Sequence, residues 1–344
     1  MKIVSNKPTI TRKELEGVLD CLIHDEINTG SSVKTFESAF CDITGFKYPL
    51  AVNSLTSAYI LIFKSLEITA DDEVIIPSIM NQSPLSAMHI TGGKPVIIDT
   101  DSNSIFPSAE QIKSSITEKT KAIIICDTFG YHFDKSILED INIPVIADIS
   151  CSIGTEYNES HAGSYGTFAV ASFAPSMAIT TGNGGIVLTN NSRYFSAMRE
   201  LRGYKEETIN YDFTLTDIQA AMGISQLIKL KDFLKRRREI ANKFHESIRL
   251  TSHKTLLPFS PDYGYQTFPV IFDAPADRVE KYWRKSGIEI VKAAPAPLHL
   301  LLDYKGFDYP NSDRIAKKLY SIPLYPTLTK MEIEKISKTL ASFI

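Results

Sequence analysis

The strongest constraint on the fold is a repeated alternation of short apolar runs with helical patterns along residues 48–189. Short runs that are apolar throughout and bounded by turn residues are typical of strands buried on both faces of a sheet. Helices between such strands provide the crossovers of a parallel sheet. We expect strands at Tyr48–Val52, Glu73–Ile76, Pro95–Asp99, Ala122–Cys126, Pro144–Asp148, Phe168–Phe173 and Gly185–Thr189.

Helical patterns precede and separate these strands. Residues 11–24 begin with a capping box formed by Thr11 and Glu14 and then repeat leucine and valine at helical spacing. Comparable patterns predict further helices at Val33–Thr44, Ala58–Leu66, Pro84–Thr91, Ser108–Ser115, Lys135–Ile141 and Phe195–Arg202. The chain is therefore predicted to be an α/β protein with a mostly parallel sheet covered by helices on both faces.

The last third of the chain has a different pattern. A long helix is expected at Thr216–Phe233, with a charged continuation to Ile248. Its basic run, Lys235-Arg236-Arg237-Arg238, is interpreted as a solvated helix face, since such runs are seldom nucleic-acid sites. A smaller α+β unit follows, with strands at Thr267–Phe272 and Ile288–Lys292 and helices at Arg278–Ser286 and from Lys330. We expect two domains, residues 1–240 and 241–344.

Composition argues against several classes of protein. The 344 residues are 43% hydrophobic and 22% charged, and the formal net charge of −3 favours neither nucleic acid nor an anionic membrane as a partner. No apolar run approaches the roughly 20 residues needed to span a bilayer. The first residues lack the apolar core of a signal peptide. The cysteines and histidines show no metal-binding spacing. A cytoplasmic protein without a metal site is expected.

Residues 166–185 combine a strand, a hydroxyl group, a turn and several glycines. The apolar run delivers Ser172, a turn follows through Pro175 and Ser176, and a glycine-rich stretch ends at Gly185. This order is how a sheet presents polar groups to a ligand at its edge. Met177 lies where this loop would present a reactive side chain. From its residue type alone, a gap-filling core methionine is the simpler interpretation.

Two further segments reach the same sheet edge by topology. Ser54, Leu55 and Thr56 open a helix, where backbone amides and hydroxyls suit a phosphate, although such residues are more often only a helix cap. Asp148 ends a buried strand, so its carboxylate needs a partner. A cationic ring nitrogen and a structural hydrogen bond to a neighbouring loop are equally open.

A fourth segment, starting at Asn210, leads into a helix that carries small residues at Ala220, Ala221 and Gly223. Small residues permit a close contact between helices. A dimer interface and packing within the chain are equally open on that evidence.

Taken together and in order, these segments resemble the DegT/DnrJ-type family of nucleotide-sugar aminotransferases. The matching motifs cover most of the chain. They are Gly30–Val33 with Phe36 and Glu37, Val52–Thr56, Asp72–Pro77, Lys119–Ile123, Phe129–Gly130, Asp148–Gly154, Ser172–Phe173, Thr180–Gly185 and Thr216–Gly223.

The resemblance implies the fold type I, aspartate-aminotransferase-like architecture and a pyridoxal phosphate pocket at a dimer interface. Ser54, Thr56 and Ser172 match phosphate-binding positions. Asn210 matches the asparagine that reaches the phosphate from the neighbouring subunit. Asp148 matches the aspartate that pairs with the pyridine nitrogen and keeps it protonated, so that the ring can act as an electron sink.

Several positions of that pocket depart from the family pattern. Leu55 lies where the phosphate loop usually has glycine, Asn81 where an aromatic residue stacks on the ring, and Cys151 where a glutamine lies near the ring hydroxyl. The usual Glu-Gly-Gly begins with Asn183. The lysine that forms the Schiff base aligns with Met177, so no catalytic residue is assured.

Two functions follow from this comparison. The first is a ligand-binding pseudoenzyme or a non-catalytic subunit in nucleotide-sugar or surface-glycan biosynthesis, with pyridoxal or pyridoxamine phosphate bound non-covalently or not at all. The alternative is an active nucleotide-sugar aminotransferase or dehydratase that uses a non-standard residue. No lysine occurs between Lys135 and Lys205, so a neighbour in sequence cannot substitute. A homodimer, or a heterodimer with an active paralogue, is expected.

Overall fold

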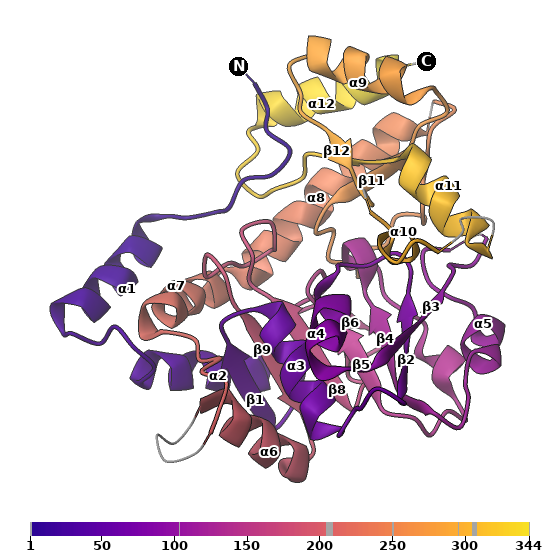
Figure 1. The fold of residues 1–344 in the computed structure, drawn as a ribbon. Helices are drawn as coiled ribbons and strands as arrows, with labels where there is room; N and C mark the ends of the chain where they lie inside the picture. Colours follow the sequence, from indigo (N-terminus) through magenta and orange to yellow (C-terminus); the bar gives the residue numbers. More distant parts are fainter. Residues whose placement is uncertain are drawn as a thin grey trace.

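A seven-stranded sheet forms the centre of the larger part of the chain (Figure 1). The computed structural model describes residues 2–102, 104–203, 209–249, 251–294, 296–304 and 308–343. Only β9 runs against its neighbours β1 and β8, and the other neighbouring strands pair in parallel. The strand order is β1 (Tyr48–Val52), β9 (Gly185–Thr189), β8 (Phe168–Ser172), β5 (Val145–Asp148), β4 (Thr120–Cys126), β2 (Glu73–Pro77) and β3 (Lys94–Ile98). The mostly parallel sheet is confirmed.

Helices cover both faces of this sheet because its strands are apolar on both sides. Along β8, Phe168 and Val170 face one apolar cluster, whereas Ala169 and Ala171 face another. The first cluster is covered by α3 (Leu55–Ser65), α4 (Ser83–Thr91) and α6 (Ser192–Gly203). The second is covered by α2 (Ser31–Thr44), α7 (Asp217–Ile228) and the start of α8 (Leu230–Ile248). Two helices complete this part of the chain, α1 (Arg12–Ile23), which packs on α7, and α5 (Ala109–Ser114).

The smaller part is built on a four-stranded antiparallel sheet. Its order is β10 (Lys254–Thr255), β11 (Phe268–Ile271), β13 (Leu319–Ile322) and β12 (Val291–Lys292). Its helices are α9 (Ala276–Lys285), α10 (Leu298–Leu301), α11 (Pro310–Lys318) and α12 (Lys330–Ser342). Helix α8 runs without a break past residue 240, so it joins the two parts, and the domain boundary stays a prediction.

Several expected elements differ in detail. The single long helix expected from Thr216 is wrong, because the chain turns at Lys229 between α7 and α8. The helix expected at Lys135–Ile141 is only the short 3-10 turn Lys135–Leu138. The sequence analysis also missed α11, β13 and the small hairpin of β6 (Glu156–Tyr157) and β7 (Ser160–His161).

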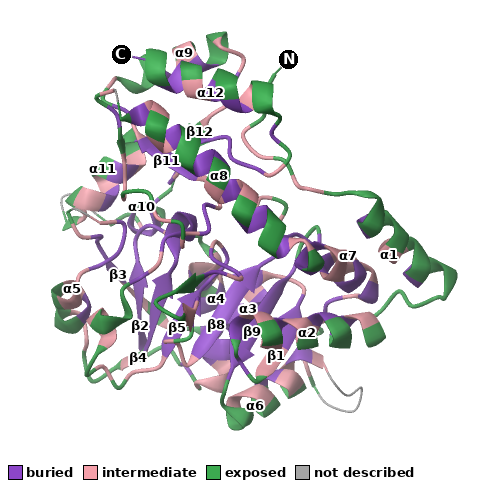
Figure 2. Ribbon diagram, turned by 180° about the vertical axis from the view of Figure 1, so that it is seen from behind, coloured by how far each residue is buried: buried purple, intermediate pink, exposed green. Residues whose placement is uncertain are grey.

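The solvated face expected for the basic run of α8 is wrong at Arg237, although Lys235 is exposed. Arg237 is 2% exposed, and its guanidinium donates to the carbonyls of Tyr265 (3.2 Å), Gln266 (2.8 Å) and Leu324 (2.9 Å). Helix α8 runs from the larger part into the smaller part, and Figure 2 shows buried stretches along it. The Arg237 guanidinium therefore lies inside the protein, where it satisfies backbone carbonyls of the smaller part.

Within the described residues, no helix combines the length and apolarity needed to cross a bilayer. The four cysteines are all free thiols.

Candidate functional site

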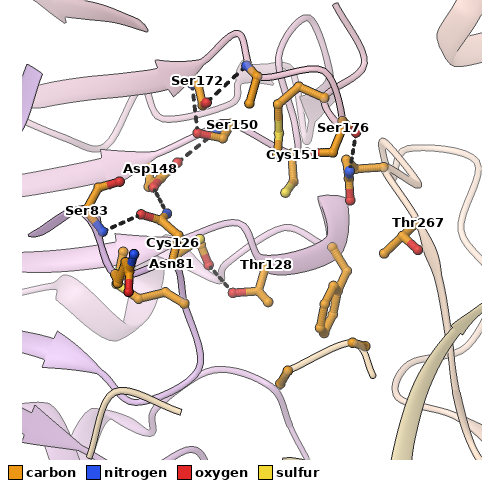
Figure 3. A pocket seen from close by; sticks show the side chains of 18 of the residues that line it. Asn81, Ser83, Cys126, Thr128, Asp148, Ser150, Cys151, Ser172, Ser176 and Thr267 are labelled. Carbon is orange, nitrogen blue, oxygen red and sulfur yellow. Dashed lines mark hydrogen bonds between the residues drawn. The ribbon is translucent and has the colours of Figure 1, made fainter. Parts of the chain in front are cut away.

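A cavity of about 680 Å³ lies at the carboxyl ends of β5 and β8, where the larger part meets the smaller part. This is the sheet edge where parallel strands usually bind ligands. The structure brings eight of the predicted site residues together here: Ser54, Leu55, Thr56, Asn81, Asp148, Cys151, Ser172 and Met177. Figure 3 shows the polar side chains of this cavity, and their roles toward a cofactor stay predictions.

One end of the cavity has the donors that a phosphate needs. The Ser54 hydroxyl caps α3 by accepting from the Ser57 amide (3.0 Å). The amides of Leu55 and Thr56, in the first turn of α3, are left without an intrahelical acceptor, as at every helix start. Such amides and the positive end of the helix dipole favour an anion. The Ser172 hydroxyl lines the same cavity.

Gly185, the first residue of β9, lets the backbone of that strand approach the start of α3 closely. A Cβ on Gly185 would lie 2.9 Å from the Ser54 carbonyl oxygen and 3.0 Å from the Leu55 nitrogen. Leu55 itself is 7% exposed and belongs to the apolar cluster around α3. Its side chain is therefore part of the core on one side while the residue lines the cavity on the other.

The other end of the cavity is organised around Asp148, which has no exposed surface. Its Oδ2 accepts from the Tyr59 hydroxyl (3.1 Å) and from Asn81 Nδ2 (2.9 Å), and its Oδ1 accepts from the Ser150 amide (3.0 Å). Burial raises the pKa of Asp148, and hydrogen bonds from Ser150, Asn81 and Tyr59 oppose that rise. The sequence left a cationic ring nitrogen and a structural hydrogen bond open as partners of this carboxylate, and structural hydrogen bonds are present.

Met177 is on the wall of the cavity and is not a core residue. It is half-buried, and its amide donates to the Ala174 carbonyl (3.0 Å) within the loop that follows β8. The interpretation as a gap-filling core methionine is therefore wrong. The smaller part holds this loop, because Gln266 Nε2 donates to the Ser176 carbonyl at 2.6 Å.

Within the described residues, the ionisable groups of the wall besides Asp148 are one lysine and two cysteines. The lysine among the lining residues is Lys292, whose amine lies 4.0 Å from the centroid of the Tyr320 ring and donates to the Lys317 carbonyl. Burial raises the pKa of the Cys151 thiol to about 12, and the nearby Asp148 adds to that rise. The thiol is therefore protonated at neutral pH and a poor nucleophile.

The fourth predicted segment lies apart from the cavity of its own chain. The Asn210 carbonyl oxygen Oδ1 accepts from the Asp212 amide (3.0 Å). The small residues of α7 pack within the chain, since a Cβ on Gly223 would lie 2.5 Å from the Phe36 ring of α2. The backbone of Ala221 faces Gly17 of α1. Of the two alternatives for this helix, intrachain packing is the one observed.

Sequence reasoning missed several residues of the site, among them Tyr59, Ser150, Gln266 and Thr267. Tyr59 is fully buried in an apolar helix, so its hydroxyl gave no signal of a polar role. Ser150 could have been found, since it follows Asp148 by two residues at the strand end. Gln266 and Thr267 come from the smaller part, and Arg237 of α8 donates to the Gln266 carbonyl (2.8 Å).

The comparisons with known proteins identify the family. The model of the DegT/DnrJ/EryC1/StrS aminotransferase family matches residues 8–341. The chain belongs to this family.

Solved structures agree with this DegT/DnrJ-type assignment in fold. The chain is similar to the aminotransferase TlmJ from Streptoalloteichus hindustanus, with 22% identity, a TM-score of 0.91 and 99% and 98% of the two chains covered. It is similar to Helicobacter pylori PseC, an aminotransferase involved in the biosynthesis of pseudoaminic acid (22%, 0.90, 99% and 98%). It is also similar to the PLP-form of Spr1654 from Streptococcus pneumoniae, which is described as a sugar aminotransferase (22%, 0.92, 99% and 98%).

Pyridoxal phosphate is the cofactor of this DegT/DnrJ-type family, and the cavity fits it at one end only. The unpartnered first-turn amides of α3 and the Ser172 hydroxyl suit a phosphate. At the ring end, Asp148 already has donors from its own chain, and the lysine of the described wall, Lys292, already donates to the Lys317 carbonyl. The residues present therefore do not fit the complete group as a covalently anchored cofactor.

Proposed function

We propose that this DegT/DnrJ-type protein does not perform ordinary transamination and acts as a ligand-binding pseudoenzyme, or as a non-catalytic subunit, in nucleotide-sugar metabolism. The observation that carries the proposal is that Met177 lies on the cavity wall. The proposal takes this position as that of the family's Schiff-base lysine, as the family resemblance implies. The amine of Lys292, the lysine among the described lining residues, is engaged by Tyr320 and Lys317.

The chemical reason is that a thioether cannot replace an amine. When bound, pyridoxal phosphate supplies an electron sink, but a protein amine must anchor it and move the proton at the substrate carbon. Met177 can form neither a Schiff base nor a bond to a transferable proton. Loss of a general base alone lowers rates by about 10²–10⁴-fold. The loss of the covalent anchor adds to this effect.

The proposed partner is a second copy of the chain or a catalytically active relative. Helix α1 turns an apolar row toward solvent, with exposed fractions of 65% for Leu15, 54% for Leu19 and 66% for Ile23. Figure 2 shows this helix as largely exposed. An apolar row of this kind supports a protein interface. We propose that Asn210 then reaches the cavity of the partner, as the family resemblance implies.

Absorbance spectra with added pyridoxal phosphate test the proposal. For the wild-type protein we expect the spectrum of free cofactor, without the near-visible band of a protein Schiff base. Met177→Lys tests the same point from the other side, because it restores the amine at the cavity wall. A Schiff-base band in the variant alone would support the proposal. The alternative, an active enzyme that uses another amine, predicts the Schiff-base band in both proteins. If that amine belongs to Lys292, a single Lys292→Ala substitution in the wild-type chain should abolish the band.

A further inference from the structure

The side chain of Asn81 is held at both ends of its amide. Its Nδ2 donates to Asp148 Oδ2 at 2.9 Å, and its Oδ1 accepts from the Ser83 amide at 3.0 Å. Because an acceptor faces one end and a donor faces the other, the orientation of this amide is fixed by its surroundings. Figure 3 shows Asn81 between Asp148 and Ser83.

With Asn81 in place, three donors reach the Asp148 carboxylate. The Tyr59 hydroxyl and Asn81 Nδ2 both donate to Oδ2, and the Ser150 amide donates to Oδ1. Because a carboxylate oxygen accepts about two hydrogen bonds, Oδ2 is fully used. A protonated ring nitrogen could therefore approach Oδ2 only by displacing one of its two donors. Of these two, Asn81 lines the cavity as an exposed residue, whereas Tyr59 is fully buried.

The ionisable side chains of the described wall are Asp148, Lys292, Cys126 and Cys151. Asp148 Oδ2 already accepts two hydrogen bonds, and the amine of Lys292, the one basic group among them, lies over the Tyr320 ring and donates to the Lys317 carbonyl. Burial raises the pKa of both thiols, so they are uncharged at neutral pH. The other polar groups of the wall are hydroxyls and amides, such as those of Ser176, Gln266 and Thr267.

We propose that Asn81 takes the place of a ring N–H on Asp148, so that the cavity selects phosphate esters with an uncharged ring over the protonated pyridine of the family's cofactor. The inference rests on the proposed function only in taking this cavity as the ligand site. Asn81 thereby determines specificity without taking part in a reaction. The ligands it favours carry both a phosphate, held at the start of α3, and a neutral, hydrogen-bonding ring, held near Asp148.

Two matched probes test this selection by titration calorimetry. One is pyridoxamine phosphate, and the other is its analogue with a C–H group in place of the ring nitrogen. We expect the wild-type protein to bind pyridoxamine phosphate no more tightly than the carbon analogue. In Asn81→Ala the carboxylate regains a free acceptor. The affinity for pyridoxamine phosphate should then rise about tenfold or more relative to that for the analogue, which is the usual effect of a charge-assisted hydrogen bond. Gln82→Ala, a neighbouring change in the same wall, is the control and should leave the ratio unchanged.

Three results would overturn the inference. They are a wild-type preference of tenfold or more for pyridoxamine phosphate, an unchanged ratio in Asn81→Ala, and a failure of both probes to bind any variant. Neither probe carries an aldehyde, so neither can form a Schiff base with a protein amine. Failure of this inference is therefore distinguishable from failure of the proposed function, which is tested by the Schiff-base absorbance band with pyridoxal phosphate.

Discussion

Replacing Asp127 by asparagine should remove a large part of the pH dependence of stability. Asp127 directly follows β4, between the cavity residues Cys126 and Thr128, and is 1% exposed. Burial raises its pKa from 3.8 to about 7, against hydrogen bonds from the Ser152 hydroxyl (2.6 Å) and the Phe133 amide (3.4 Å), and the negative charge of Asp148 adds to the rise. The folded state therefore holds a proton that the unfolded state releases at lower pH.

The sign and size of the effect follow from this difference. Below pH 3.8 both states are protonated, and the contribution of Asp127 to stability is fully present. It is lost as the pH rises toward about 7 and stays lost above that value. At about 1.4 kcal/mol per pKa unit, the gap of about three units corresponds to about 4 kcal/mol. Of this, about 2–3 kcal/mol falls between pH 5 and pH 8.

Urea unfolding at pH 5 and pH 8 measures the effect. The fall in unfolding free energy between the two pH values should be about 2–3 kcal/mol smaller in Asp127→Asn than in the wild type. Asp140→Asn, at an exposed carboxylate, should leave the wild-type fall unchanged. An identical fall in wild type and Asp127→Asn would refute the reasoning, because it would mean that Asp127 is ionised in the folded protein at pH 5.

Further predictions concern α1, the glycine segment and assembly. Burial alone raises the pKa of Glu14, but hydrogen bonds from its partners, of which that from Lys229 is the strongest, lower it to about 2. Glu14→Gln should therefore lose about 3 kcal/mol of unfolding free energy at pH 7. That difference should shrink as the pH falls from 4.5 toward 2, which urea titrations would detect. Gly185→Ala should lower stability by about 1–3 kcal/mol in thermal unfolding because its Cβ meets the Ser54 backbone, whereas Gly17→Ala, with no atom nearer than 3.4 Å, should not. Leu19→Glu should convert a dimer into a monomer in light scattering, and an unchanged mass would exclude α1 as the interface.

Much of the larger part could be predicted from the sequence, because its strands are apolar on both faces. The run Phe168–Ala171 alternates large and small apolar residues, and both sets are buried against helices. By contrast, β13 (Leu319–Ile322) is short and follows directly on the charged α11, so it carries no comparable pattern. The turn at Lys229 has no glycine or proline to mark it.

The candidate site was predictable in its positions but not in its contacts. The sequence places Asp148 at a strand end, where ligands bind, and that inference needs only the topology. Its partners Tyr59 and Asn81 lie 89 and 67 residues away in sequence, and no local pattern encodes such contacts. The same limit explains Arg237, because a charged run does not reveal which buried carbonyls lie opposite it.

The most direct test of the central claim is the intact mass of the wild-type protein after incubation with pyridoxal phosphate and reduction with borohydride, with Met177→Lys measured beside it. Borohydride converts a Schiff base into a stable covalent adduct. The account predicts an unmodified mass for the wild type and a single adduct at position 177 in the variant. A stoichiometric adduct on one lysine of the wild-type protein would contradict it, because the chain would then hold a reactive amine that anchors the cofactor.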